Sequence, residues 1–176
     1  MKNKIKKVII MKITKELATN VMIGVIGGAL VYRIYCNIQA KNNNPEEIKK
    51  VIQNWLDTVC KHNPQAIVDL YAPDGVLLGT VAKTMKVGRE RIAEYFNMFV
   101  EKKPCGVFTE VNIQNFGSNY AVADGTYDFT LLNDKGEKDV VSARFTFVLR
   151  RVVGGPNTPN RGGWVIASHH SSVNPE

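Results

Sequence analysis

Two long strand patterns joined by a hairpin signal constrain the fold of this chain more than any other feature. Tyr120–Leu132 and Lys138–Arg151 both alternate apolar and polar side chains, as strands with one buried face do. Between them, Asn133–Gly136 carries the residues of a tight turn. A shorter alternating run, Val107–Gln114, precedes this hairpin, and Trp164–Ser172 follows it after a loop rich in glycine and proline. We therefore predict four consecutive antiparallel strands.

Helical patterns occupy the first half of the domain. A helix is predicted to start at Pro45, because apolar residues then recur every three or four positions over about four turns. Shorter helices are predicted over 65–71 and 88–102, and a turn at 72–75 leads into a short strand, 76–78. Helices that precede an antiparallel sheet indicate an α+β domain. We expect a strongly curved, cone-shaped sheet that packs on the long first helix and leaves a cavity inside.

The charge of the chain is concentrated at its N-terminus. Residues 1–40 hold seven lysine and arginine side chains against one acidic residue, whereas residues 41–176 hold 16 basic against 15 acidic side chains. The net charge of +7 therefore does not belong to the domain, and we expect no nucleic-acid partner. A length of 176 residues suits one domain with a substantial core.

An uncharged apolar block, Val21–Tyr32, follows the lysines. A basic region before a short apolar block is typical of an export signal, and twelve residues are short for a bilayer span, which needs about 20. An uncleaved anchor, with Arg33 at the far interface, and a soluble amphipathic helix are the alternatives. We expect segment 17–36 to make the protein extracytoplasmic, either membrane-anchored or secreted.

The predicted domain organisation has three parts: a signal or anchor region over 1–40, a polar linker over 41–44, and the α+β domain over 45–176. The three cysteines, Cys36, Cys60 and Cys105, are too few and too scattered for a disulfide framework or a metal site. We expect them to be buried or half-buried thiols. No cofactor and no metal ion are expected.

The arrangement of motifs resembles a known superfamily. The motifs are Trp55 on the first helix, Tyr71–Gly75, Gly88–Ile92 at the start of the third helix, and Arg144–Val148 ahead of Gly163–Ser172. Together they resemble the nuclear transport factor 2-like superfamily. Within it, the chain is most similar to the association (hub) domain of calcium/calmodulin-dependent protein kinase II and its stand-alone bacterial relatives, over roughly 45–176.

This resemblance implies a pocket between the first helix and the sheet, and self-association as a homodimer or larger ring. Kinase hub domains line that pocket with arginines that accept an anion. Carried over to this chain, the pocket cation is Arg144, and its companion is His169 or His170, with His169 favoured by strand alternation. The chain departs from the hub pattern at 126–128, where it has Thr-Tyr-Asp in place of an arginine.

The leading hypothesis is a self-associating, hub-like domain whose pocket binds a small organic anion. The candidate ligand-binding residues are Arg144, His169, Tyr127, Asp128 and Thr146. Because charged residues in an apolar strand are rarely buried unpaired, Arg144 either holds a ligand carboxylate or pairs with Asp128 or Glu110. The alternative is a small pocket enzyme resembling ketosteroid isomerases, polyketide cyclases or epoxide hydrolases. The pair Arg150-Arg151 is expected to be a solvated strand end.

Overall fold

The computed structural model describes residues 44–152 and 163–175, which belong to one compact unit, Asn43–Glu176. The predicted signal or anchor region, including segment 17–36, lies outside the described residues, as does most of the loop before the last strand. In the described part, no helix combines the length and the apolar character needed to cross a membrane. The predicted export of the domain stays a prediction.

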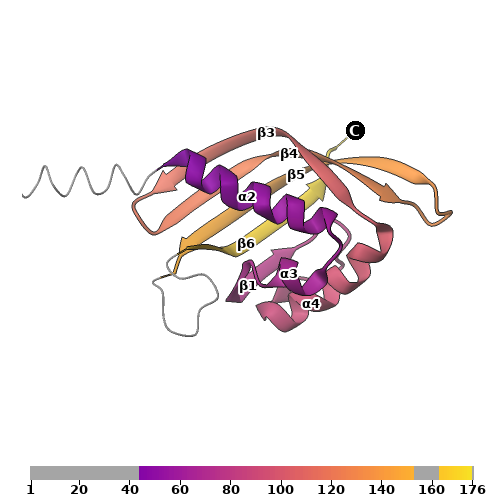
Figure 1. Ribbon diagram of the computed structural model, residues 1–176, viewed down its shortest axis with the longest axis horizontal. Coiled ribbons are helices and arrows are strands. Elements are labelled where there is room, and N and C mark those ends of the chain that lie inside the picture. The colour runs from indigo at the N-terminus through magenta and orange to yellow at the C-terminus, as the bar shows by residue number, and fades with distance from the viewer. Residues whose placement is uncertain (1–43, 153–162, 176) are drawn as a thin grey trace, which may run out of the picture. The chain divides into compact units, whose positions relative to one another are not determined.

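A curved sheet of six strands forms the framework of this unit (Figure 1). In the order in which they pair, its strands are β2 (Lys86–Val87), β1 (Tyr71–Leu78), β6 (Trp164–Val173), β5 (Lys138–Arg151), β4 (Tyr120–Leu132) and β3 (Cys105–Phe116). All neighbours are antiparallel except β1 and β6, which run parallel. The four-strand meander is confirmed, and β1 and β2 extend it beyond the predicted antiparallel arrangement.

The helices pack on one side of this sheet (Figure 1). They are α2 (Pro45–Cys60), α3 (Pro64–Val68) and α4 (Gly88–Phe99), the last followed by a 3-10 turn, Val100–Lys102. α2 begins as predicted, with Pro45 in the first turn and the side chain of Asn44 accepting the Glu46 N–H at 3.0 Å. It contacts β3 and β4, while α4 contacts β1. The α+β fold is therefore confirmed.

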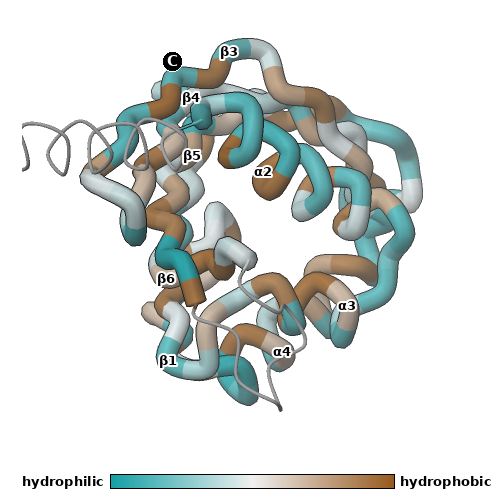
Figure 2. Tube along the Cα trace, turned by 60° about the vertical axis from the view of Figure 1, so that its left-hand side comes forward, coloured by the Kyte–Doolittle hydropathy of each residue, from teal (hydrophilic) through white to brown (hydrophobic). Residues whose placement is uncertain are grey.

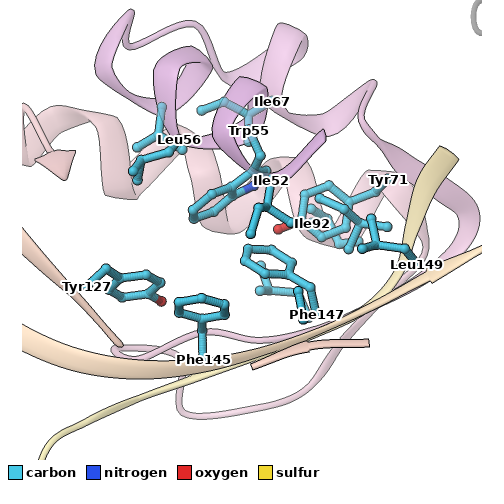
Figure 3. Close-up of a cluster of buried hydrophobic side chains, with 14 of the residues drawn as sticks. Ile52, Trp55, Leu56, Ile67, Tyr71, Ile92, Tyr127, Phe145, Phe147 and Leu149 are labelled. Atoms are coloured by element: carbon cyan, nitrogen blue, oxygen red, sulfur yellow. The ribbon is translucent and has the colours of Figure 1, made fainter. Parts of the chain in front are cut away.

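The core lies between the helices and the concave face of the sheet. Figure 2 shows the apolar segments of α2, α4 and the strands turned mostly inward. Trp55 of α2 meets Phe147 of β5 edge to face, with ring centroids 5.0 Å apart, and Tyr127 stacks on Phe145 at 5.0 Å (Figure 3). These rings make the core a continuous aromatic layer, which contributes through apolar burial and ring geometry.

The prediction of free thiols is wrong for two cysteines, because Cys60 and Cys105 form a disulfide. Cys60 is the last residue of α2 and Cys105 is the first residue of β3, 45 positions later. The contact between α2 and β3 brings the two Cα atoms to 4.4 Å, within the range of a disulfide. Sequence spacing could not reveal this pairing, since it depends on how the helix packs on the sheet. Cys36 lies outside the described residues.

Two local predictions near β1 and β5 are also wrong. Residues 72–75 do not form a separate turn but belong to β1, whose register with β6 shifts between Tyr71 and Val76. Arg150 and Arg151 are not a simple solvated strand end. Arg150 pairs with Asp74 at 2.6 Å, and Arg151 pairs with Glu47 at 2.9 Å. The guanidinium of Arg151 also lies 4.6 Å from the ring centroid of Trp164, so each arginine ties β5 to another element.

Candidate functional site

A cavity of about 220 Å³ lies between α2, α4 and the concave face of the sheet. Most of its wall is apolar, and Lys102 is the one charged side chain among the described lining residues; it pairs with Asp134 at 3.1 Å. The lining residues are Trp55, Leu77, Gly79, Thr80, Val81, Tyr95, Phe96, Phe99, Lys102, Tyr127, Phe129, Leu131, Val141, Ala143, His169, Ser171 and Val173. The cavity can therefore hold a small, mainly apolar molecule.

His169 is the most distinctive polar residue of this wall. β6 places it opposite Phe147 of β5, and the imidazole stacks on that ring with centroids 4.0 Å apart. Its Nδ1 is 2.9 Å from the hydroxyl oxygen of Tyr71 on β1. Burial, with a smaller contribution from neighbouring His170, lowers the pKa of His169 to about 3. The side chain is therefore neutral near pH 7.

A second polar group contains three hydroxyls. Tyr127 donates to Ser171 Oγ, and that atom also shares a hydrogen bond with the hydroxyl of Thr80. Burial raises the pKa of Tyr127 above its usual value, and burial also raises the pKa of Tyr95 to about 12. The tyrosines that line the cavity therefore stay protonated near neutral pH. In the part of the chain that the structure describes, this wall offers hydroxyl groups and no carboxylate.

The predicted site residues divide between the two faces of the sheet. His169 and Tyr127 face the cavity, as strand alternation requires for neighbours of the core rings. Arg144, Asp128 and Thr146 lie on the opposite, outer face, where none of them lines the cavity. The structure therefore brings together only two of the five predicted residues.

The prediction that Arg144 is buried is wrong. Its side chain is exposed, and its Nε donates to Ser172 Oγ at 2.9 Å. Neither predicted carboxylate partner forms an ion pair with it among the described residues. Arg144 is directly opposite Ser172 on β6, whereas Phe147 is opposite His169, so the arginine and the imidazole point to different faces.

The other two outward-facing candidates also have partners on their own face. Asp128 accepts a hydrogen bond from Ser142 at 2.6 Å, and Thr146 donates to Asp124 at 2.7 Å. His170 is exposed on this face as well. These side chains therefore form a polar layer on the outside of the sheet.

Several cavity residues were missed as site candidates. Tyr95 comes from α4 and Thr80 from the segment after β1, so only tertiary packing brings them to the sheet. Ser171 could have been found, because it alternates in phase with His169 on the last strand. Within residues 44–152 and 163–175, no three histidine, cysteine or acidic side chains are grouped closely enough to hold a metal ion.

The fold and this cavity define a class of protein. A curved sheet with helices on its concave side and a cavity between them is the nuclear transport factor 2-like arrangement, and solved structures of that class match. A nuclear transport factor 2-like protein from Salmonella enterica is 24% identical, with a TM-score of 0.62 over 74% of this chain and 91% of that one. At this identity the match shows the fold alone.

The family follows from closer matches. The family model for the calcium/calmodulin dependent protein kinase II association domain matches residues 44–175, so the chain belongs to that family. A putative association domain of this kind from Xanthomonas campestris is 39% identical, with a TM-score of 0.69 over 76% of this chain and 90% of that one. A steroid Delta-isomerase from Nocardioides simplex is 30% identical over 95 residues, which are 54% of this chain and 72% of the isomerase.

Proposed function

We propose that this protein is a self-associating, hub-like domain that binds a small molecule in its cavity and works outside the cytoplasm. Membership of the association-domain family supports the first part. The observation that carries the second part is the apolar cavity of about 220 Å³ with two internal polar groups, one around His169 and one around Ser171. Each part has its own test.

The outer face of the sheet supports self-association between copies of this chain. In β3, β4 and β5 this face carries four exposed apolar side chains, Val107 (62% exposed), Phe116 (57%), Tyr120 (49%) and Val140 (61%). They lie among the hydrogen-bonded polar side chains around Asp124 and Asp128. Mixed apolar and polar composition is typical of protein interfaces. The association-domain family suggests that the partner on this face is a second copy of the chain.

The cavity favours an uncharged ligand over the organic anion expected from the sequence. That expectation needed a cation inside, and Arg144 faces the other way. Among the described lining residues the one lysine, Lys102, lies at the surface, where it pairs with the exposed Asp134. Transferring an unpaired carboxylate into such an apolar space would cost several kcal/mol, on the order of the penalties known for buried ions.

The alternative function is a pocket enzyme, and the isomerase relative favours it. An isomerase of the ketosteroid type needs a carboxylate base that reaches the substrate. Neither aspartate nor glutamate lines the cavity in the described part of the chain, and Asp128 lies on the outer face. Binding without turnover is therefore the better-supported function.

Work outside the cytoplasm is supported by two independent features. The basic region and apolar block of residues 1–40 have the order of an export signal. The Cys60–Cys105 disulfide belongs to the chemistry of an oxidising compartment, because cytosolic thiols are normally kept reduced. A fusion of residues 1–40 to a periplasmic reporter that needs disulfides for activity would test this part.

Light scattering with size-exclusion chromatography tests self-association, using residues 41–176 and the full chain. We expect a dimer or a larger ring for residues 41–176, and a monomer at all concentrations would contradict the hub proposal.

Native mass spectrometry of the protein recovered from cells tests the cavity. We expect the spectra to show one small molecule retained per protomer. If the recovered protein carries no small molecule and binds none that is added to it, the binding proposal is contradicted.

A further inference from the structure

We infer that a groove beside the cavity is a second binding site, for a small amphiphile with one anionic head group and a short apolar chain. The groove lies between α4, with its 3-10 turn, and the segment that leads from β1 into β2. Its volume of about 420 Å³ is within the roughly 300–1,000 Å³ of common ligand pockets. The inference goes beyond the proposed function and does not depend on a ligand inside the cavity.

Three lysines supply the positive charge of the groove. Lys83, Lys86 and Lys102 line it, and none of its described lining residues is acidic. Lys83 is exposed, and among the described residues it takes part in no ion pair. A lysine ammonium is a point charge on a flexible stem, so it can follow a head group without a fixed geometry. The groove therefore favours a negatively charged group.

The acidic side chains nearby do not cancel this charge. Glu94 lies 3.5 Å from Lys86 and 2.8 Å from Arg91, so one carboxylate serves two cations. Lys102 pairs with Asp134, whose side chain is 97% exposed. The lining lysines and the side chains in these ion pairs together give four cations against two carboxylates. Exposed ion pairs contribute little net stability, so an anionic ligand can replace them.

Apolar side chains lie beside the lysines in the same groove. Val81 is 62% exposed and Met98 is 60% exposed, and both line it. Phe99 adds an aromatic surface and stacks on Tyr95, with ring centroids 5.6 Å apart. Covering exposed apolar surface is favourable, and a simple inorganic anion would leave it open to water. An apolar molecule would leave the lysines without a partner, so an amphiphile is the ligand that uses both parts.

The position of the groove keeps it accessible in the proposed oligomer. α4 packs on the concave side of the sheet, opposite to the outer face that is proposed for self-association (Figure 1). Tyr95, Phe99 and Lys102 line both the groove and the cavity, so the two spaces are neighbours. The charged head group nevertheless stays in the groove, because the cavity wall is mostly apolar.

Two probes with the same chain length, octanoate and octanol, test the inference on the full chain by calorimetric titration. At low salt we expect octanoate to bind about tenfold more tightly, which corresponds to about 1.4 kcal/mol and is within the range of two exposed ion pairs. Added salt should reduce this preference, because it screens exposed charges. In the variant Lys83→Glu, Lys102→Glu the preference should disappear. Both side chains reach solvent, so the fold should persist.

A matched control is Lys50→Glu, Lys61→Glu, which changes the net charge equally at two exposed lysines that do not line the groove, and it should keep the preference. Reductive methylation of lysines, measured by peptide mass spectrometry, locates the head group without a variant. Octanoate should protect Lys83 and Lys102 and leave Lys50 as reactive as before.

Equal binding of octanoate and octanol would overturn the inference, and so would an octanoate preference that survives in the groove variant. Binding of neither probe would overturn it as well. Vesicles of phosphatidylglycerol provide a further comparison. If the groove variant loses binding to these vesicles and the wild type shows no preference for octanoate, the groove contacts a membrane surface and the inference is wrong. None of these outcomes bears on a ligand inside the cavity, which the native mass spectra test separately.

Discussion

His169 shows how a single residue combines burial with a specific hydrogen bond. It is 3% exposed, stacked on Phe147 and bonded to Tyr71, so protonation would place a charge in the aromatic core. Desolvation therefore holds its pKa near 3, against an ordinary value of about 6.5. The same environment that keeps the side chain neutral also makes stability depend on pH.

The stability of the domain should fall in acid because of this histidine. Below about pH 6.5 the unfolded chain binds a proton at this position and the folded chain does not, so stability present above pH 6.5 is lost progressively towards pH 3. The loss attributable to His169 should approach about 4 kcal/mol at pH 3. Urea unfolding between pH 7 and 3.5 measures it.

The Tyr71→Phe, His169→Phe double variant is the comparison for that titration. Its stability should fall less steeply between pH 6.5 and 3.5 than that of the wild type, since the remaining groups titrate alike in both proteins. His170→Gln changes the exposed neighbour and should keep most of the wild-type slope. Parallel curves for the wild type and the double variant would show that His169 is not the group responsible.

The sequence contained enough information to orient most of the strand residues. Phe145 and Phe147 are apolar, so they mark the buried face of β5 and put Arg144 outside. The prediction for Arg144 considered the cost of burying its charge but did not first establish on which face of β5 the side chain lies. For His169 the deciding fact is the pairing of Phe147 with His169, a register that no local pattern specifies.

At the scale of the elements, the Cys60–Cys105 disulfide is the clearest feature that the structure shows and the sequence patterns did not predict. The helix and strand patterns predicted α2 and β3 to within about two residues, because period and capping are local signals. They did not predict β2, a two-residue strand, or the parallel pairing of β1 with β6. Both depend on contacts between distant segments.

Removal of the disulfide should destabilise the domain. In the Cys60→Ser, Cys105→Ser variant the unfolded chain regains the entropy of a loop of 45 residues, which corresponds to a loss of about 3–4 kcal/mol. Thermal or urea unfolding measures this loss. Reduction of the wild type should reproduce it, whereas reduction of the double variant should change nothing. An unfolding midpoint that is insensitive to reductant would contradict the linkage.

At the scale of the whole molecule, the sequence predicted the family and the cone-like α+β fold, while the chemistry of the cavity came from the structure. The family motifs lie on elements whose order is visible in the sequence. The cavity wall combines α2, α4 and four strands, so its charge and polar groups depend on packing. This is why the sequence led to the expectation of an anion pocket, whereas the described wall is mostly apolar and carries its charge on Lys102.

Outer-face charges should weaken self-association without disturbing the cavity. The Phe116→Glu, Val140→Glu variant places like charges on an exposed surface, so the fold should persist while the oligomer dissociates at least tenfold more readily. Sedimentation velocity measures the change. Met98→Glu, also on an exposed apolar residue but on α4, is the control and should keep the wild-type oligomer. Identical sedimentation of all three proteins would rule out this face as the interface.

The parallel pairing of β1 with β6 has a consequence for how the chain is made. The hydrogen bond between Tyr71 and His169 spans 98 positions, and the central strand β6 fills the gap between β1 and β5. Until residues 164–173 leave the ribosome, the sheet is split in two and the aromatic layer stays open to solvent. Such long-range closure makes folding slow, because distant segments must meet before their contacts add stability. The six-stranded sheet can therefore close only after β6 has been synthesised, however early the helices and the β3–β5 meander form.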